Sequence, residues 1–452
     1  MSGNVAAIEP PVRWDIVQEH LAEAEFLGEQ LVAAMDSHGY RIDEVVSGPY
    51  ERFAAHVDAL AVGGAAVAER SLYPTLHDEE AEAGTRTAAA LGALTSTHPA
   101  AAERMLGDYA AASQGAQLAI ADALVLWDAP RATFRLQTLL ASTPLELCAP
   151  LFAACARRAM DPGAPLEAAL RSGDPALAAA AASAAMYAPK ALLTSVEWSL
   201  QFDDERLLPA VSAGLVMGSP HAWNTATHLA RDKAASHRTA MAHVATLDGI
   251  TATGIFVARL DDAAARPDAL WALGYCGTLE AAEACLGWLA DADVGPLAGE
   301  AFATITGLPM DEEGCWLDAP TEAGQDPAPG SDDEDDLPDL DDDLATDLMP
   351  GDDDDLPQPV PEAIAAWWRA RRGAFRSGQR YVLGRAADEG SLRRALGLES
   401  TRRRHERAFE ILARTRGACI VPTWRTPTSQ VQLTSALSLP RIDGNRAFSR
   451  IS

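Results

Sequence analysis

The sequence contains almost no lysine, few aromatic residues and no long apolar run. Lysine occurs only at Lys190 and Lys233, so the basic residues are almost all arginine. Aromatic residues make up 6% of the chain, which favours helices that pack closely through small side chains. No apolar run of the signal-peptide type follows Met1, and no segment approaches eighteen consecutive strongly apolar residues. These absences predict a soluble, cytoplasmic protein that does not bind a membrane.

Motifs that mark common catalytic and metal sites are also missing. The six cysteines contain no Cys-x-x-Cys pair, which favours reduced structural thiols over a disulfide or a metal role. His221, His228, His237 and His243 lie close in sequence but lack a His-Glu-x-x-His spacing. There is no Gly-x-Ser-x-Gly motif and no phosphate-binding glycine loop. The sequence therefore predicts no catalytic residue, no metal and no cofactor, although scattered carboxylates leave hydrolysis open.

Length and charge narrow the class of protein further. The 452 residues are 48% hydrophobic, which is enough for two or three domains with buried cores. The formal net charge of −29 argues against a general attraction to nucleic acid or to anionic membranes. A protein partner is the more plausible ligand for such a chain.

The stretch from Asp268 to Leu308 gives the clearest structural signal. It predicts a helix that ends at Gly277, a second helix with Thr278 as its N-cap, and a third helix that ends near Gly307. The first two helices carry apolar residues on more than one face, so each needs neighbours on both sides. We expect stacking surfaces between helices at the side chains Trp271, Tyr275, Cys276, Cys285 and Trp288.

A period of about thirty residues extends this pattern through the chain. The turn before each second helix is marked by proline and later by glycine: Pro99, Pro130, Pro162, Pro189, Pro220, Gly249, Gly277 and Gly307. Helices rich in small residues, such as TAAALGALT and AAAASAAMY, precede these prolines and glycines. The alternation predicts an all-α solenoid of short repeats, with an irregular helical bundle as the alternative.

The N-terminal region predicts two helices that cap the repeats. The first covers residues 14–36, with candidate core residues Ile16, Leu21, Leu27, Leu31 and Met35. The second covers residues 49–70, with candidate core residues Phe53, Val57, Leu60 and Val67. The predicted domains are a cap (1–80), a HEAT-like repeat solenoid (81–310), an acidic disordered linker (311–361) and an arginine-rich C-terminal helical segment (362–452).

An acidic tract breaks the repeat pattern. Asp332 to Asp355 contains fourteen acidic residues and no basic one. Such a run repels itself and buries little apolar surface, which predicts a solvated, disordered linker. The leucines interleaved with the acids could instead make the tract an interaction segment. The tract lacks the expected glycine and the terminal glutamate of a calcium-binding EF-hand loop.

The last ninety residues reverse the charge. Glu362 to Ser452 contains eighteen arginines and seven acidic residues, and predicts helices over 362–375 and 402–416 with an extended stretch over 418–433. Candidate partner-binding residues are Trp367, Trp368, Arg369, Arg371, Arg372, Arg402, Arg403, Arg404 and Arg407. These residues fit a basic face docked on the repeats, a contact for an acidic protein, or a nucleic-acid contact. The acidic tract is expected to fold over the arginines and screen them.

A resemblance to a known family supports the repeat prediction. The unit ALWALGYCGTLEAAEACLGWLADADVGPLAGEAFATITGL resembles a short HEAT repeat. Together with WDIVQEHLAEAEFLGEQLVAAMD, FAAHVDALAVGGAAV and SGQRYVLGR, it makes the whole chain similar to a proteobacterial family of HEAT-repeat proteins. Members of that family are often encoded near type VI secretion and effector-delivery genes. The shared motifs are structural, so the resemblance implies no catalytic residue.

The sequence therefore favours a non-enzymatic scaffold. In this interpretation the repeat surface holds a protein partner, which the resemblance implies to be a secretion-system effector or component, and the basic tail adds a contact. A nucleic-acid-binding HEAT protein resembling the HEAT-like DNA glycosylases is one alternative. An enzyme or accessory subunit resembling the HEAT-like bilin lyases is another. The sequence leaves the oligomeric state open.

Overall fold

The computed structural model describes residues 12–232, 237–317 and 356–450. These residues are mainly helical, and their strands are limited to two short antiparallel pairs, which confirms the all-α class. Contacts group the chain into two compact units. Unit 1 comprises Met1–Asp36, Ile42–Ala222 and Arg416–Leu437, and unit 2 comprises Ser37–Arg41, Trp223–Thr415 and Ser438–Ser452.

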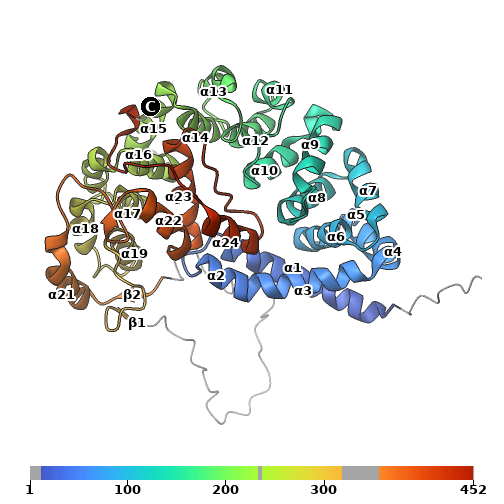
Figure 1. Ribbon diagram of the computed structural model, residues 1–452, viewed down its shortest axis with the longest axis horizontal. Coiled ribbons are helices and arrows are strands. Elements are labelled where there is room, and N and C mark those ends of the chain that lie inside the picture. Colours follow the sequence, from blue (N-terminus) through green and yellow to red (C-terminus); the bar gives the residue numbers. More distant parts are fainter. Residues whose placement is uncertain (1–11, 233–236, 318–355, 451–452) are drawn as a thin grey trace, which may run out of the picture. The chain divides into compact units, whose positions relative to one another are not determined.

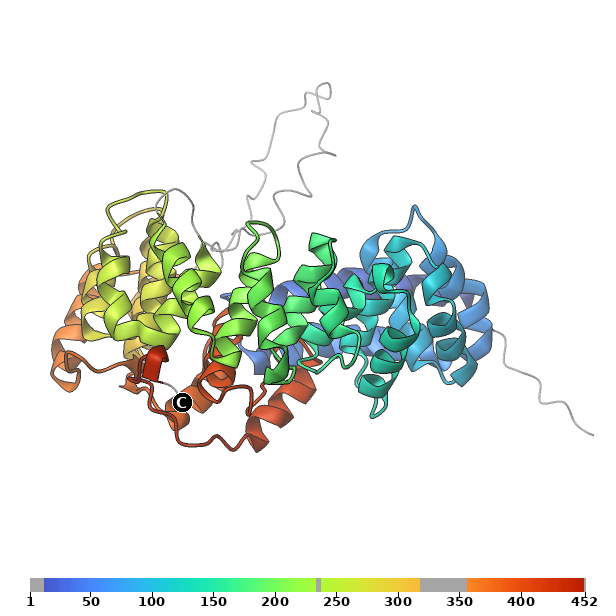
Figure 2. The same ribbon diagram turned by 90° about the horizontal axis from the view of Figure 1, so that it is seen from above.

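Unit 1 is built from short helices in sequence order. They are α1 (Trp14–Ala34), α2 (Ile42–Val45), α3 (Glu51–Val62), α4 (Gly64–Val67), α5 (Tyr73–His77), α6 (Ala83–Thr95), α7 (Pro99–Gly107), α8 (Gln114–Leu126), α9 (Ala132–Ser142), α10 (Ala149–Arg157), α11 (Leu166–Leu170), α12 (Pro175–Ala185), α13 (Leu193–Ser199), α14 (Leu207–Met217) and α24 (Pro427–Ala436). Helices α6, α8, α10, α12 and α14 pack in succession (Figures 1 and 2). Their many alanines let neighbouring helices approach closely.

The N-terminal helices are close to their predicted positions. Helix α1 begins at Trp14 and buries Leu21, Leu27 and Leu31. Ile16 is wrong as a core residue, because its side chain is 39% exposed and the adjacent Val17 is buried instead. The predicted second helix is interrupted: α3 ends at Val62, and residues 64–77 continue as short helical segments. Its predicted core residues Phe53, Val57, Leu60 and Val67 are all buried.

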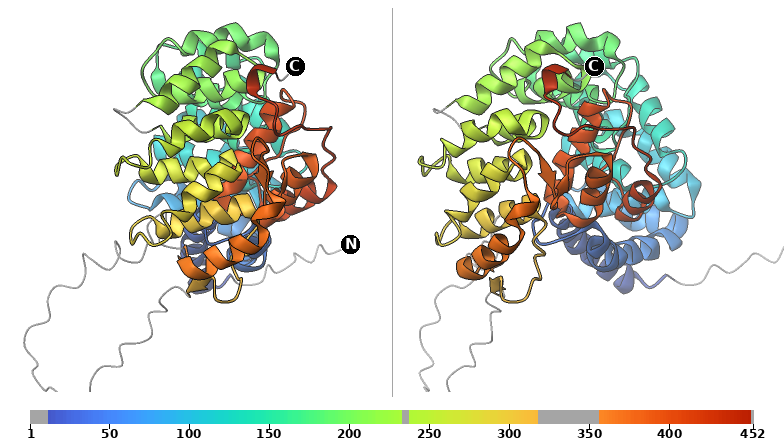
Figure 3. Two further views of the ribbon diagram at one scale, coloured as in Figure 1. Left: turned by 90° about the vertical axis from the view of Figure 1, so that its left-hand side faces the viewer. Right: turned by 60° about the vertical axis from the view of Figure 1, so that its left-hand side comes forward.

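Unit 2 contains helices from the predicted repeat region and most of the arginine-rich segment. Its helices are α16 (Arg238–Val257), α17 (Arg266–Cys276), α18 (Leu279–Leu286), α19 (Gly295–Thr306), α21 (Pro361–Arg371), α22 (Glu389–Leu398) and α23 (Thr401–Arg414), while α15 (Pro220–Arg231) lies across the boundary at Ala222. Its strands are β1 (Trp316–Leu317), β2 (Gln358–Pro359), β3 (Tyr381–Val382) and β4 (Arg385–Ala386). Helices α17 and α19 pack side by side, and α23 lies against α16 (Figure 3).

The central stretch folds as the sequence predicts. Helix α17 ends at Cys276, and Gly277 adopts the left-handed conformation with φ of +66°. The Thr278 hydroxyl accepts a hydrogen bond from the amide of Ala281 at 3.1 Å and caps α18. Gly307, with φ of +72°, follows α19 in the same way. Glycine suits these positions because an added Cβ would crowd a left-handed backbone.

Helix α16 is broken where the sequence predicts a turn. Asp248 has non-helical angles (φ −148°, ψ 50°), and Gly249 follows it. The segment is the only described helix long and apolar enough to cross a membrane by length and composition, and most of it is buried inside the protein. A kinked, buried helix of this kind is consistent with a soluble protein.

The motif SGQRYVLGR forms a hairpin that docks on helix ends in unit 2. Strands β3 and β4 are joined by Leu383 and Gly384, both with positive φ. The amide of Tyr381 donates to the carbonyl of Gly277 at 2.7 Å, and the amide of Leu383 donates to the carbonyl of Thr304 at 2.9 Å. The hairpin thus satisfies carbonyls at the C-terminal ends of α17 and α19 that have no partner within their own helices.

The C-terminal segment differs in two ways from its prediction. Helices α21 and α23 confirm two predicted helices, but α22 was not predicted. The stretch expected to be extended contains helix α24. Residues 416–437 of the segment belong to unit 1 and the remainder to unit 2.

The predicted acidic linker is only partly described. Its two ends pair as strands in unit 2, with Trp316 opposite Pro359 and Leu317 opposite Gln358. Both Trp316 and Pro359 lie against α19 at Gly299. The acidic tract itself, and its expected folding over the arginine segment, lie outside the described residues.

Substitution of Gly277 tests the close approach of the hairpin. In Gly277→Ala, the new Cβ would collide with the carbonyl oxygen of Tyr381 and sit on a left-handed backbone. We expect the free energy of unfolding to fall by more than about 2 kcal/mol, measured by urea denaturation. Gly254→Ala is the matched control: it has no heavy atom within 4 Å of the added Cβ and should be neutral or stabilising. Equal urea midpoints for both variants would contradict the close packing of the hairpin against Gly277.

Candidate functional site

The candidate partner-binding residues fall into two groups within unit 2. Trp367, Trp368, Arg369 and Arg371 lie on α21, and Arg372 begins the short helical turn η6 (Arg372–Ala374) that follows it. The other four, Arg402, Arg403, Arg404 and Arg407, lie on α23. The two groups differ in exposure, and this difference decides which residues can contact a partner.

The assignment of Arg403, Arg404 and Arg407 to a partner surface is wrong. Their side chains are at most 1% exposed. Arg402 is half-buried, and its backbone amide donates to the carbonyl of Ser37 at 3.2 Å. The sequence showed the density of arginine on α23 but not that this face points into unit 2.

Arg403 is balanced by a glutamate of α19. Its Nε donates to Glu300 Oε1 at 2.8 Å, and its Nη2 pairs with Glu300 Oε2. Its Nη1 donates to the carbonyl of Trp271 at 2.9 Å. The guanidinium also lies 3.6 Å above the Trp271 ring and 4.5 Å from the Tyr275 ring centre. Trp271 and Tyr275, expected to stack between helices, therefore also hold the tail.

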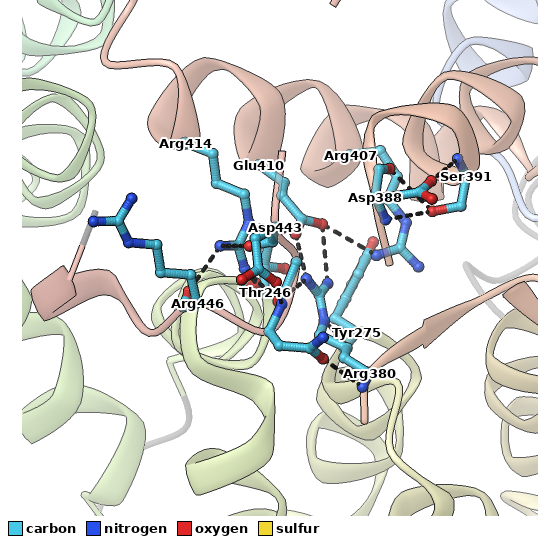
Figure 4. Close-up of polar contacts among 12 residues, drawn as sticks. Thr246, Tyr275, Arg380, Asp388, Ser391, Arg407, Glu410, Arg414, Asp443 and Arg446 are labelled. Carbon is cyan, nitrogen blue, oxygen red and sulfur yellow. Dashed lines mark hydrogen bonds and ion pairs between the residues drawn. The ribbon is translucent and has the colours of Figure 1, made fainter. Parts of the chain in front are cut away.

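Three further buried arginines converge on Glu410 (Figure 4). Arg380 forms a fork with both carboxylate oxygens, one of them at 2.9 Å from Nη2. Arg414 Nε donates to Oε1 at 2.8 Å, and Arg407 Nη1 donates to Oε2 at 3.4 Å. Arg407 also pairs with Glu399 at 2.9 Å. We call these residues, with Arg403 and Glu300, the buried charge cluster.

Helix-end carbonyls complete the balance of the cluster. Arg380 Nε donates to the carbonyl of Tyr275 at 3.1 Å, near the end of α17. Arg414 Nη2 donates to the carbonyl of Thr246 at 2.9 Å, just before the break in α16. These carbonyls carry the negative end of each helix dipole, so a guanidinium is favoured there. Figure 4 shows Thr246 and Tyr275 beside the arginines.

The charges of the cluster set the pKa of its carboxylates. Burial alone would raise the pKa of Glu410, but the charges of Arg380 and Arg414 outweigh it and hold the pKa at about 2. Burial likewise opposes ionisation of Glu300, and Arg403 lowers its pKa below the usual value. Both carboxylates are therefore ionised at neutral pH, and the arginines they balance remain charged.

The spacing of the charged residues on α23 is more informative than the number of arginines alone. Arg403, Arg407, Glu410 and Arg414 lie at positions i, i+4, i+7 and i+11, which place them on one helical face. This face carries three arginines and one glutamate, so it needs carboxylates from outside the helix when it is buried. Glu406 lies on the same helix, and its carboxylate contacts His243 Nδ1 at 3.0 Å.

The α21 group stays on the surface, apart from its anchor. Trp368 is 3% exposed and packs its ring against Phe302 and Phe375. Arg369, Arg371 and Arg372 are exposed. Arg371 lies 4.3 Å above the ring of the half-buried Trp367, and Arg372 pairs with Glu283 at 2.5 Å.

In unit 1 the tail is held in a similar way. Asp128 accepts hydrogen bonds from Arg425 at 2.6 Å, from Thr426 at 3.2 Å and from Ser429. Burial opposes ionisation of Asp128, but these donors lower its pKa. Arg157 lies 5.3 Å above the ring of Trp424.

The clusters hold the tail and offer no open reactive group. Within residues 12–232, 237–317 and 356–450, no three histidine, cysteine or acidic side chains are placed to hold a metal ion. Comparisons with protein-family models, curated proteins and solved structures gave no match. The HEAT-family resemblance therefore stays a prediction.

Glu410→Gln tests the balance of the buried charge cluster. The substitution keeps the side-chain shape but leaves Arg380, Arg407 and Arg414 without their shared carboxylate. We expect a loss of about 3–5 kcal/mol in the free energy of unfolding, measured by urea denaturation. Glu283→Gln, at the exposed pair with Arg372, should cost at most about 1 kcal/mol. A loss at Glu410 no greater than that at Glu283 would contradict the central role of the cluster.

The lowered pKa of Glu410 predicts a specific loss of stability in acid. Because its pKa is about 2 in the folded protein and about 4.5 when unperturbed, its stabilisation is complete above about pH 4.5. The stabilisation is lost as the pH falls toward 2. Urea midpoints measured across this range should fall more steeply for the wild-type protein than for Glu410→Gln. Parallel curves would show that Glu410 is not the carboxylate that titrates.

Proposed function

We propose that the protein is a non-enzymatic scaffold that binds an acidic protein partner through a basic surface, which we call the α21 surface. It comprises Arg369, Arg371, Arg372 and Arg376. The observation that carries this proposal is the exposure of all four side chains, two on α21 and two in the segment directly after it, next to a helix that Trp368 fixes to unit 2. An anchored helix presents its charges with little loss of conformational entropy on binding.

Two of the four arginines of the α21 surface make no ion pair with a described residue, which supports an external partner. Arg372 contacts Glu283, and Ser377 nearby contacts Glu280. Among the described residues, neither Arg369 nor Arg371 pairs with a carboxylate. An acidic segment could therefore bind them without first displacing an ion pair among the described residues, which favours rapid, electrostatically steered association.

The position of the tail argues against the repeat face as the main contact. In unit 2 the hairpin and α23 contact the end of α17 at Gly277, the break in α16 at Thr246 and the middle of α17 at Trp271. A partner on that face would have to displace buried ion pairs. The proposed contact therefore lies on α21, where the arginines already face solvent.

Acidic protein is favoured over nucleic acid for two reasons. Trp368 is buried between aromatic rings, so it is not available to stack on bases. Arg403 and Arg407 are held by glutamates and cannot contact phosphates.

The resemblance to HEAT-repeat proteins encoded near type VI secretion genes indicates where to seek the partner. In this proposal the partner is an effector or a component of such a system, and the protein acts as its adaptor or chaperone. The proposal of an acidic contact does not depend on that identity.

Charge reversal on the α21 surface tests the proposal. Arg369→Glu with Arg371→Glu should reduce recovery of the partner in pulldowns from the native host by about tenfold, because two attractive contacts become repulsive. Recovery is measured by quantitative mass spectrometry after nuclease treatment.

The matched control reverses two other exposed arginines, Arg393 and Arg394 of α22. It makes the same change in net charge and should leave recovery unchanged. Equal losses in both double variants would point to a nonspecific charge effect. Loss of the partner on nuclease treatment of the wild-type sample would instead favour nucleic acid.

A further inference from the structure

Two histidines of unit 1 face each other across neighbouring helices. His20 lies on α1 and His56 on α3, and their Nδ1 atoms are 3.2 Å apart. The ring planes are inclined at 74°, with centroids 5.1 Å apart. Both side chains are half-buried, so solvent can reach the pair. Neither histidine belongs to the group of four between His221 and His243, and the proposed scaffold function uses neither of them.

The separation of the two nitrogens matches that of two ligands on one metal ion. Zinc binds histidine nitrogen at about 2.0–2.1 Å, and tetrahedral geometry then places two such nitrogens about 3.3 Å apart. The observed 3.2 Å is close to that value. The remaining two coordination positions would be open to water or to an added ligand.

The helices hold this spacing without help from the imidazoles. Helices α1 and α3 pack directly against each other. Their approach is close, because a Cβ added at Gly28 of α1 would lie 3.2 Å from the ring of Phe53 on α3. Ligands on two packed helices are positioned more rigidly than ligands on loops.

We propose that His20 and His56 form a binding site for a divalent transition metal, such as zinc or nickel. Without metal, the Nδ1–H of one ring donates to the Nδ1 of the other. With metal, both rings carry their proton on Nε2, and both Nδ1 lone pairs coordinate the ion. The ion links α1 to α3 and stabilises unit 1. Imidazole ligands favour zinc and nickel over magnesium and calcium, which prefer oxygen.

Titration of the full chain with metal tests the site. The protein is prepared without an affinity tag, and Zn²⁺ or Ni²⁺ is added in a calorimeter. We expect saturation at one ion per chain and a higher melting temperature, with no response to Mg²⁺. His20→Gln and His56→Gln should each weaken binding by at least about tenfold. His77→Gln, which alters an exposed histidine of α5, should leave binding unchanged.

Other outcomes would overturn the proposal. Absence of saturable binding would leave the pair as a hydrogen-bonded contact only. Binding that is unchanged in either variant would assign the metal to other groups, such as the cysteines. Because a variant could fold poorly, imidazole ¹⁵N spectra of the wild-type protein provide a second measurement. Zn²⁺ should shift the Nδ1 signals of two histidines together, and a shift of one alone or of none would contradict the site.

Discussion

The main physical constraint on unit 2 is that a buried guanidinium group keeps its charge. Arginine does not lose its proton inside proteins, so each buried arginine needs a carboxylate or several carbonyls beside it. Glu300, Glu399 and Glu410 supply the carboxylates, and helix ends supply the carbonyls. The position of α23 meets this requirement, because its four cluster residues find their partners there. The arginine-rich tail is thus part of the fold, although its density of charge resembled a binding surface.

Arginine at helix ends recurs in both units. In unit 1, Arg158 donates to the carbonyls of Leu124 and Val125 at the end of α8, at 2.7 and 3.0 Å. Arg416 Nη1 likewise donates to the carbonyl of Leu215, near the end of α14, at 3.1 Å. The planar fork of arginine reaches several carbonyls at once, which a lysine ammonium does not. This repeated use gives a structural reason why the chain contains so little lysine.

Local structure could be predicted from the sequence, whereas the packing of the tail could not. The end of α17 at Gly277 and the cap at Thr278 depend on residues within one turn, so their pattern is readable. The pair of Arg403 with Glu300 joins residues 103 positions apart. No local rule selects that partner among many carboxylates. The spacing on α23 could have indicated that its arginines share one face, but not which distant carboxylates balance them. The contact of His20 with His56 is likewise long-range. Exposure of Arg369 and Arg371 agreed with the sequence because α21 buries its tryptophan instead.

The division of the tail between the units also has a consequence for synthesis of the protein. Unit 1 includes residues 416–437, and unit 2 includes residues up to 415 and again from 438. A ribosome therefore releases neither unit in finished form until residue 437 has emerged. During that interval the helix ends that Arg380, Arg414 and Arg416 will cover face solvent or chaperones. A chain that terminates before Leu437 would leave both units incomplete, and such products are expected to be cleared by proteolysis.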